Sequence, residues 1–289
     1  AEEIINRAFE SIPLAMDEYK PDGIYPEGYS YWGYGTTFNV LFLSAVEKYL
    51  GNDRGLTDNS GFLNTGHFLK HMITPTGGNF TWGDCGTGTN IHPAMFWFAE
   101  RTGNPSVLWS EKQFLQKSNF DSFKGIRELP AILIWGKNIP LENISEPEEK
   151  FWMGQGRNPV AMMRSDWTKQ AAYVGFKAGS PSVNHGHMDV GSFIFETNGR
   201  RWATDLGMQN YESLESLGMQ IFGKAQDAER WTIFRMNTFS HNVLIFDNQQ
   251  QRVNGFAKID KFSDDENSMF AVSDISTLYR DQVKSAERG

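Results

Sequence analysis

The sequence predicts a multidomain α+β protein in which helical hairpins precede an antiparallel β-sheet or sandwich. Up to about residue 140, apolar residues recur at helical spacing between glycines and prolines. Residues 137–150 are polar and contain two prolines, which is typical of a linker. Beyond them the apolar segments become short and are separated by Gly and Asn turns. We therefore expect a helical domain over residues 1–140 and a β domain over residues 141–289.

The helical half is expected to contain six helices. Prolines stand near several helix starts and glycines follow helix ends, and the short connections between helices favour antiparallel neighbours. The expected helices cover residues 4–19, 36–50, 59–73, 93–102, 105–116 and 122–135.

The β half is expected to contain seven short strands. Asn198-Gly199 is a strong hairpin turn signal between two of them. The expected strands cover residues 160–163, 171–176, 192–196, 201–204, 242–246, 256–260 and 268–272.

The most informative motif is the run NHGHMDVGSF at residues 184–193, which places two imidazoles and a carboxylate at a spacing of two. In an extended strand, residues at this spacing point to one face, so His185, His187 and Asp189 are expected to converge. Such a cluster can bind a metal, transfer a proton, or do both. A polar strand end with two hydrogen-bonded histidines is the alternative.

Further candidate metal ligands follow in the sequence. The hairpin turn carries Asp205 back towards the histidines, and His241 stands beside another apolar run. His187, Asp205 and His241 would form a His₂Asp site with one open position, a ligand set that suits Zn²⁺. A structural metal that ties three strands together is equally compatible with this pattern.

Composition excludes several classes of protein. The net charge of −8 argues against nucleic acid as the main partner. No apolar run reaches the ~18 residues that a membrane-spanning helix requires. The single cysteine, Cys85, excludes an internal disulfide framework. The first residues do not form a signal peptide, and we expect the chain to be a fragment truncated at both ends.

The chain resembles the heparinase II/III-like family of polysaccharide lyases. The resemblance is carried by NHGHMDVGSFIFETNGRRWATDLG, by SHNVLIFDNQQQ, by DGIYPEGYSYWGYGTTF and by the glycine-aspartate turn in NFTWGDCG. It covers nearly the whole chain. It implies an incomplete α/α toroid followed by an antiparallel β-sandwich.

The resemblance also implies roles for individual residues. His187, Asp205 and His241 match the family's metal ligands, and His185 matches a histidine beside the catalytic tyrosine. Tyr31 is the best match for that tyrosine.

Tyr29 and Tyr34 are close alternatives to Tyr31, and the whole aromatic cluster could instead cap a helix. An Asn or His that neutralises the substrate carboxylate in the family would lie before residue 1. Candidate substrate-binding residues are Trp32, His92, Tyr211 and Arg235.

The expected function is β-elimination in a uronate polysaccharide such as heparan sulfate, heparin or alginate. A lyase removes the C5 proton of the uronate and expels the C4 oxygen, so it needs a base and an acid. Tyr31 is expected to be the acid, with His185 as partner base. The family implies a bacterial protein of the periplasm or the extracellular space.

Two other functions stay open. A glycoside hydrolase would need paired carboxylates, and Asp84, Glu27 and Asp189 show no persuasive pairing. A non-catalytic glycan-binding protein is the other alternative.

Overall fold

The structure is a computed structural model that describes residues 2–117 and 119–289. It divides into two compact units. The helical unit comprises the residues up to 25 together with 31–71 and 89–148, and the β unit comprises 26–30, 72–88 and 149–289. The units therefore interleave along the chain, because two short segments from the helical half belong to the β unit. The division into consecutive domains at residue 140 stays a prediction.

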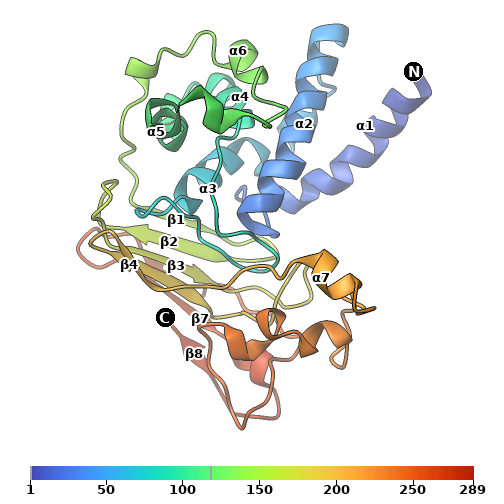
Figure 1. Ribbon diagram of the computed structural model, residues 1–289, viewed down its shortest axis with the longest axis vertical. Helices are drawn as coiled ribbons and strands as arrows, with labels where there is room; N and C mark the ends of the chain where they lie inside the picture. The colour runs from blue at the N-terminus through green and yellow to red at the C-terminus, as the bar shows by residue number, and fades with distance from the viewer. Residues whose placement is uncertain (1, 118) are drawn as a thin grey trace. The chain divides into compact units, whose positions relative to one another are not determined.

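The described part of the first half contains six α-helices, and five of the predicted segments overlap a helix over most of its length (Figure 1). The second helix begins at Gly28 and not at residue 36. The segment rich in glycine and aromatic residues before residue 36 is therefore helical and not a loop. The third helix begins at Thr65 and not at residue 59, because a 3₁₀ turn, Phe62–Asn64, precedes it. The helices are α1 (Glu2–Met16), α2 (Gly28–Leu50), α3 (Thr65–Met72), α4 (Ala94–Thr102), α5 (Trp109–Lys117) and α6 (Ala131–Trp135).

The prediction of one long helix over residues 122–135 is wrong. A 3₁₀ turn, Phe120–Phe123, ends early, and α6 begins only after Pro130. Proline favours the first positions of a helix and disfavours its interior, so Pro130 starts a short helix instead of continuing a long one.

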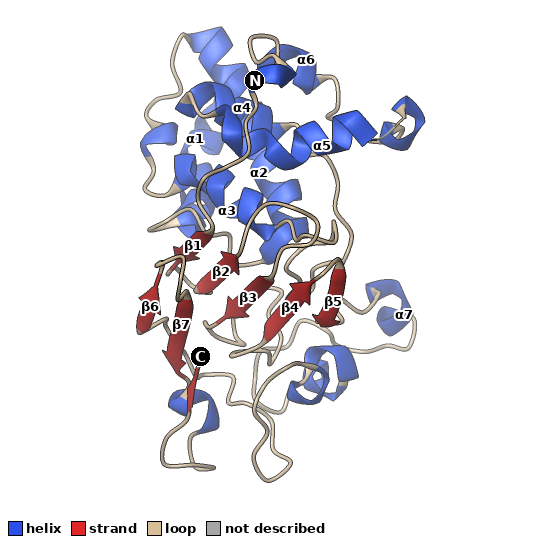
Figure 2. Cartoon of the chain, turned by 90° about the vertical axis from the view of Figure 1, so that its left-hand side faces the viewer, coloured by secondary structure: helices blue, strands red, loops and turns tan. Residues whose placement is uncertain are grey.

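The β unit contains two antiparallel sheets. The larger sheet has the order β1-β2-β3-β4-β5, as Figure 2 shows, and the smaller one has the order β6-β7-β8. The strands of the larger sheet are β1 (Phe151–Gly154), β2 (Val160–Arg164), β3 (Tyr173–Lys177), β4 (Phe193–Thr197) and β5 (Arg200–Ala203). Those of the smaller sheet are β6 (Lys261–Ser263), β7 (Phe270–Asp274) and β8 (Glu287–Arg288).

The predicted hairpin is confirmed. β4 and β5 pair antiparallel, and the turn between them is Asn198-Gly199. Both turn residues have positive φ, 53° at Asn198 and 70° at Gly199. A two-residue hairpin turn of this kind requires such angles, and Asn and Gly tolerate them best.

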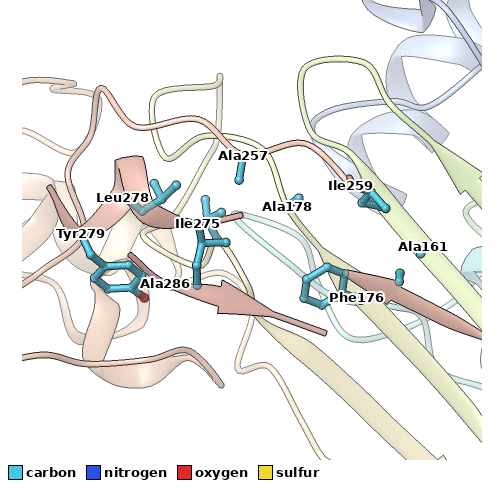
Figure 3. Close-up of a cluster of buried hydrophobic side chains, with 11 residues drawn as sticks. Ala161, Phe176, Ala178, Ala257, Ile259, Ile275, Leu278, Tyr279 and Ala286 are labelled. Atoms are coloured by element: carbon cyan, nitrogen blue, oxygen red, sulfur yellow. The ribbon is translucent and has the colours of Figure 1, made fainter. Parts of the chain in front are cut away.

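One apolar cluster joins the two sheets (Figure 3). It contains Ala161 of β2 and Phe176 of β3 from the larger sheet, and Ala271 of β7 from the smaller one. Tyr279 closes it and donates a hydrogen bond from its hydroxyl to the carbonyl of Leu244 (2.6 Å). The sheets therefore share a core, as the prediction of an antiparallel β half requires. The α/α toroid stays a prediction.

Two predicted strands are wrong. Residues 242–246 are irregular, and the side-chain amide of Asn242 donates to the carbonyls of Phe193 (2.9 Å) and Thr204 (3.0 Å). Residues 256–260 contribute only an isolated bridge between Ala257 and Gly179. Side-chain hydrogen bonds replace strand pairing at Asn242, which an apolar pattern does not reveal. The short strands β1, β6 and β8 were not predicted.

Across residues 2–117 and 119–289, no helix has both the length and the apolar character needed to cross a membrane.

The helical unit buries a carboxyl group in α5. Glu111 is 2% exposed. Burial raises the pKa of its carboxyl from 4.5 to about 8, although the backbone N–H groups of Glu111 and His92 act in the opposite direction. Glu111 is therefore protonated in the folded protein at neutral pH.

We expect the Glu111→Gln variant to gain stability over the wild type as pH rises. The folded pKa lies above the unfolded one, so the wild type has its full stability below pH 4.5 and loses it up to about pH 8. The loss is about 1.4 kcal/mol per pH unit within that window. Urea unfolding at pH 5 and pH 7.5 measures the difference, with the exposed Glu10→Gln as control. Parallel profiles for the wild type and Glu111→Gln would contradict the burial argument.

Candidate active site

The histidine motif is a loop and not a strand. Residues 184–191 lie outside the sheets, and His185 has a left-handed φ of 55°. The prediction of one strand face is therefore wrong, since a residue with positive φ breaks the alternation of an extended chain. A turn at Gly83-Asp84 lies against this loop, and the Asp84 N–H donates to the His185 carbonyl (3.0 Å). A Cβ at Gly83 would lie 2.5 Å from that carbonyl oxygen, so this position requires glycine.

The Asp84 carboxylate is the centre of the site. Its Oδ1 contacts His187 Nε2 at 2.9 Å. Its Oδ2 accepts hydrogen bonds from the Tyr211 hydroxyl (2.6 Å) and Arg230 Nη2 (2.8 Å), and it lies 3.3 Å from His185 Nδ1. One buried carboxylate thus holds four polar side chains from three other parts of the sequence.

Asp84 is ionised despite its burial. Burial opposes ionisation, but hydrogen bonds from His185 and His187 and the charge of Arg230 outweigh it and hold the pKa of the carboxyl well below its usual range. Arg230 is itself buried, and it also donates to the carbonyls of Gly186 (2.9 Å) and Ile221 (2.7 Å). The pair is a buried ion pair whose remaining donors are satisfied, which is the condition under which such pairs are stable.

His185 is oriented through Nδ1. The Tyr211 hydroxyl lies 2.9 Å from this atom, and the two rings stack at an interplanar angle of 14°. Tyr211 begins the short helix α7 (Tyr211–Glu215). Nδ1 faces Asp84 and Tyr211. In the tautomer whose Nδ1–H donates to Asp84, Nε2 carries no proton and is the basic nitrogen. Tyr211, predicted to bind substrate, thus lies at the site beside His185.

Two more imidazoles form a buried pair beside this cluster. The rings of His187 and His241 have centroids 5.3 Å apart. His187 Nδ1 and His241 Nε2 are buried and have no hydrogen-bond partner within the described chain. Potential ligand atoms from His187, Asp189 and His241 all lie within 4.8 Å of one another. Orphaned ring nitrogens beside a carboxylate fit a divalent metal that prefers N and O ligands, Zn²⁺ among them.

Two carboxylates adjoin the histidine pair. Asp205, the predicted ligand, has its Oδ2 2.7 Å from His241 Nδ1. Asp189 Oδ1 accepts from the buried ammonium of Lys177 (2.7 Å), and its Oδ2 accepts from the Gly83 N–H (3.1 Å). Asp189 therefore joins the two histidines in the group whose ligand atoms lie within 4.8 Å of one another, whereas Asp205 contacts Nδ1 of His241.

The charges around these histidines differ. Burial lowers the pKa of His187, which favours the neutral form that binds metals. Burial also opposes protonation of His241, but the Asp205 carboxylate outweighs it and raises the pKa of that imidazole.

Three predicted site residues lie in the helical unit. Tyr31, in α2, is half-buried. Trp32 is 0% exposed, and its Nε1 donates to Thr65 Oγ1 (2.8 Å). His92 packs edge-on against Trp32, with ring centroids 5.6 Å apart, and burial lowers its pKa to about 4. Trp32 is thus a core residue, which contradicts a sugar-stacking role for it.

Arg235 lies in the β unit and braces a loop. Its Nη1 donates to the carbonyls of Leu206 (2.7 Å) and Met208 (3.2 Å). These contacts fix the chain just after Asp205 and do not point to substrate binding.

The central role of Asp84 was not predicted from the sequence. Asp84 was named only in the glycine-aspartate turn of the family resemblance and as a candidate carboxylate of a hydrolase. The sequence did not mark Lys177 as the partner of Asp189, because a lysine in an apolar strand resembles an ordinary strand-surface charge.

Comparison with known proteins found one family model that matches part of the β half. Residues 156–279 match the family model "Heparinase II/III-like, C-terminal". The resemblance that the sequence indicated is therefore confirmed. A search of curated proteins found no match.

Solved structures show the same fold. The heparan sulfate lyase HepC from Pedobacter heparinus is 16% identical, with a TM-score of 0.59 over 95% of this chain and 37% of that chain. A heparinase III structure is 12% identical, with a TM-score of 0.58 over 94% of this chain and 39% of that chain. The chain thus spans less than half the length of these structures.

The Lys177–Asp189 pair gives a stability prediction. We expect Lys177→Met to lower the free energy of unfolding by about 3–5 kcal/mol, since it leaves the Asp189 charge buried without its partner. Lys258→Met, at a mostly exposed lysine, should change it by less than about 0.5 kcal/mol. Urea unfolding measures both, and equal losses would show that the buried pair contributes nothing specific.

Proposed function

We propose that the protein is a polysaccharide lyase that acts on uronate-containing glycosaminoglycans, because its residues 156–279 match the heparinase II/III-like C-terminal family model. The observation that carries the proposal is the Asp84-centred cluster, which holds His185 beside a hydroxyl and a metal-compatible histidine pair. The similar structures are named as a heparan sulfate lyase and as heparinase III, which favours a glycosaminoglycan over alginate.

The proposed reaction is β-elimination. A base removes the C5 proton of the uronate, and an acid protonates the C4 oxygen as it leaves. We assign the base to His185, whose Nδ1 is held by Asp84 and Tyr211. We assign the acid to Tyr31, on the family resemblance of the α2 segment.

We propose that His187, Asp205 and His241 hold a divalent metal, most simply Zn²⁺. Asp205 is preferred over Asp189 because the Lys177 ammonium already neutralises Asp189 and would repel a cation there. When bound, the metal would supply a positive charge that fixes the two histidine-bearing segments. His187 and His185 contact the two oxygens of the Asp84 carboxylate. A metal that fixes His187 would therefore also fix the position of His185, the proposed base.

Two further proposals rest on the family alone. The helical unit would form part of an α/α toroid, and the β unit part of an antiparallel sandwich. The protein would act in the periplasm or outside the cell, where glycan-degrading relatives of the family work.

The hydrolase alternative receives no support from its candidate carboxylates. Asp84 and Asp189 are buried in ion pairs, and Glu27 accepts a hydrogen bond from the side chain of Asn184 (2.8 Å). A glycosidase needs two carboxyl groups that flank the bond to be cleaved.

Incubation with heparan sulfate should produce a rise in ultraviolet absorbance, because elimination leaves a conjugated double bond. We expect Tyr31→Phe and His185→Ala each to lower kcat by about 10²–10⁴, the usual contribution of an acid or base. Tyr49→Phe, exposed on the same helix as Tyr31, is the matched control and should retain activity.

Heparin, heparosan and alginate complete the substrate panel. No absorbance rise on any of them, with folded protein and bound metal, would refute the lyase. A rise that survives in His185→Ala would refute the assignment of the base.

Metal analysis separates the two candidate carboxylates. The wild type should retain about one equivalent of zinc after dialysis, and Asp205→Asn should lose it. Asp189→Asn should keep the metal but unfold at lower urea concentration, since Lys177 loses its partner. Elemental analysis with unfolding curves measures both. Loss of zinc in Asp189→Asn alone would move the ligand from Asp205 to Asp189.

A further inference from the structure

A small pocket of about 30 Å³ opens beside His185 within the β unit. Pro181 and segments 183–186 and 222–224 form its walls, together with Arg230 and Trp231. No Asp or Glu lines it, although the chain as a whole carries 35 acidic residues and a net charge of −8. The pocket is too small for a sugar ring but has room for a substituent about the size of a water or a few heavy atoms.

The two cations of the pocket differ in how their charge is balanced. Arg230 is buried and paired with Asp84 at 2.8 Å. Lys224 is exposed, and within residues 2–117 and 119–289 its ammonium forms no ion pair. Lys224 therefore leaves a net positive charge at the pocket wall, which favours an anionic group.

Phe222 adds an apolar surface next to the proposed base. It is 59% exposed, although its ring lies edge-on to His185 (centroids 6.5 Å apart) and to Tyr211 (5.5 Å). An exposed aromatic ring held in place by neighbouring rings is a typical lining of a ligand site. The C–H face of a sugar can pack on it while a charged substituent reaches Lys224.

We propose that this pocket is a subsite for the carboxylate or sulfate group of the sugar next to the bond that is cleaved. Lys224 would be the ionic partner of that group, and Phe222 the surface on which the sugar ring packs. The inference rests on the proposed lyase function, because it takes the substrate to be a uronate polymer bound at His185. It adds a specificity residue that lies outside the acid–base and metal groups.

Lys224→Gln tests the subsite, and Lys169→Gln is the matched control, an exposed lysine on the turn before β3 with the same change of charge. A charge-assisted hydrogen bond is lost only in the first variant, so KM for heparin should rise about tenfold or more in Lys224→Gln. The change should fall mainly on KM, since Lys224 binds a group that does not react. KM in Lys169→Gln should stay within about twofold of the wild type.

Two substrates distinguish the sources of the anion. Heparosan carries carboxylates without sulfates, and carboxyl-reduced heparin carries sulfates without carboxylates. A loss of affinity in Lys224→Gln for heparosan assigns the pocket to the carboxylate. A loss confined to heparin and its carboxyl-reduced form assigns it to a sulfate.

Calorimetric binding of a heparin tetrasaccharide, in a Tyr31→Phe background that slows turnover, separates this inference from the function. Equal affinities for Lys224→Gln and Lys169→Gln would overturn the subsite even if the wild type is a lyase. Weaker binding in Lys224→Gln alone would support the subsite even if no polymer gives an absorbance rise, an outcome that would refute only the lyase.

Discussion

The carboxylate of Asp84 makes contacts on both oxygens, and the candidate site depends on this arrangement. Oδ1 meets His187, of the proposed metal pair, and Oδ2 meets His185, the proposed base. Arg230 and Tyr211 complete the set on Oδ2. A buried carboxylate with this many donors is stable as an anion, and each donor is costly to leave without it. The geometry of the metal pair and that of the base are therefore set by one group.

This arrangement joins parts of the chain that are distant in sequence. Asp84 follows a glycine whose missing side chain lets the turn approach the His185 carbonyl. The β-strands hold the other members: His185 and His187 precede β4, and Lys177 ends β3, where it pairs with Asp189. The rigid sheets thus carry irregular loops, which is how many folds position reactive side chains.

The sequence predicted the features that local chemistry determines. The Asn198-Gly199 turn follows from local turn geometry. His187 and His241 do lie close together, although the two strands from which this was expected are irregular segments. The positive φ of His185 and the role of Asp84 were not predictable, because both depend on a contact between segments about a hundred residues apart. Trp32 was misassigned for a related reason, since aromatic residues in a core and in a sugar site look alike in sequence.

The most direct test of the Asp84 arrangement is the tautomer of His187, read from long-range ¹⁵N–¹H NMR of the metal-free protein. The account predicts that Nε2 carries the proton, because this atom donates to Asp84, and that Nδ1 is unprotonated. It also predicts that this preference is lost in Asp84→Asn. An Nδ1–H tautomer in the wild type, or an unchanged tautomer in Asp84→Asn, would contradict it.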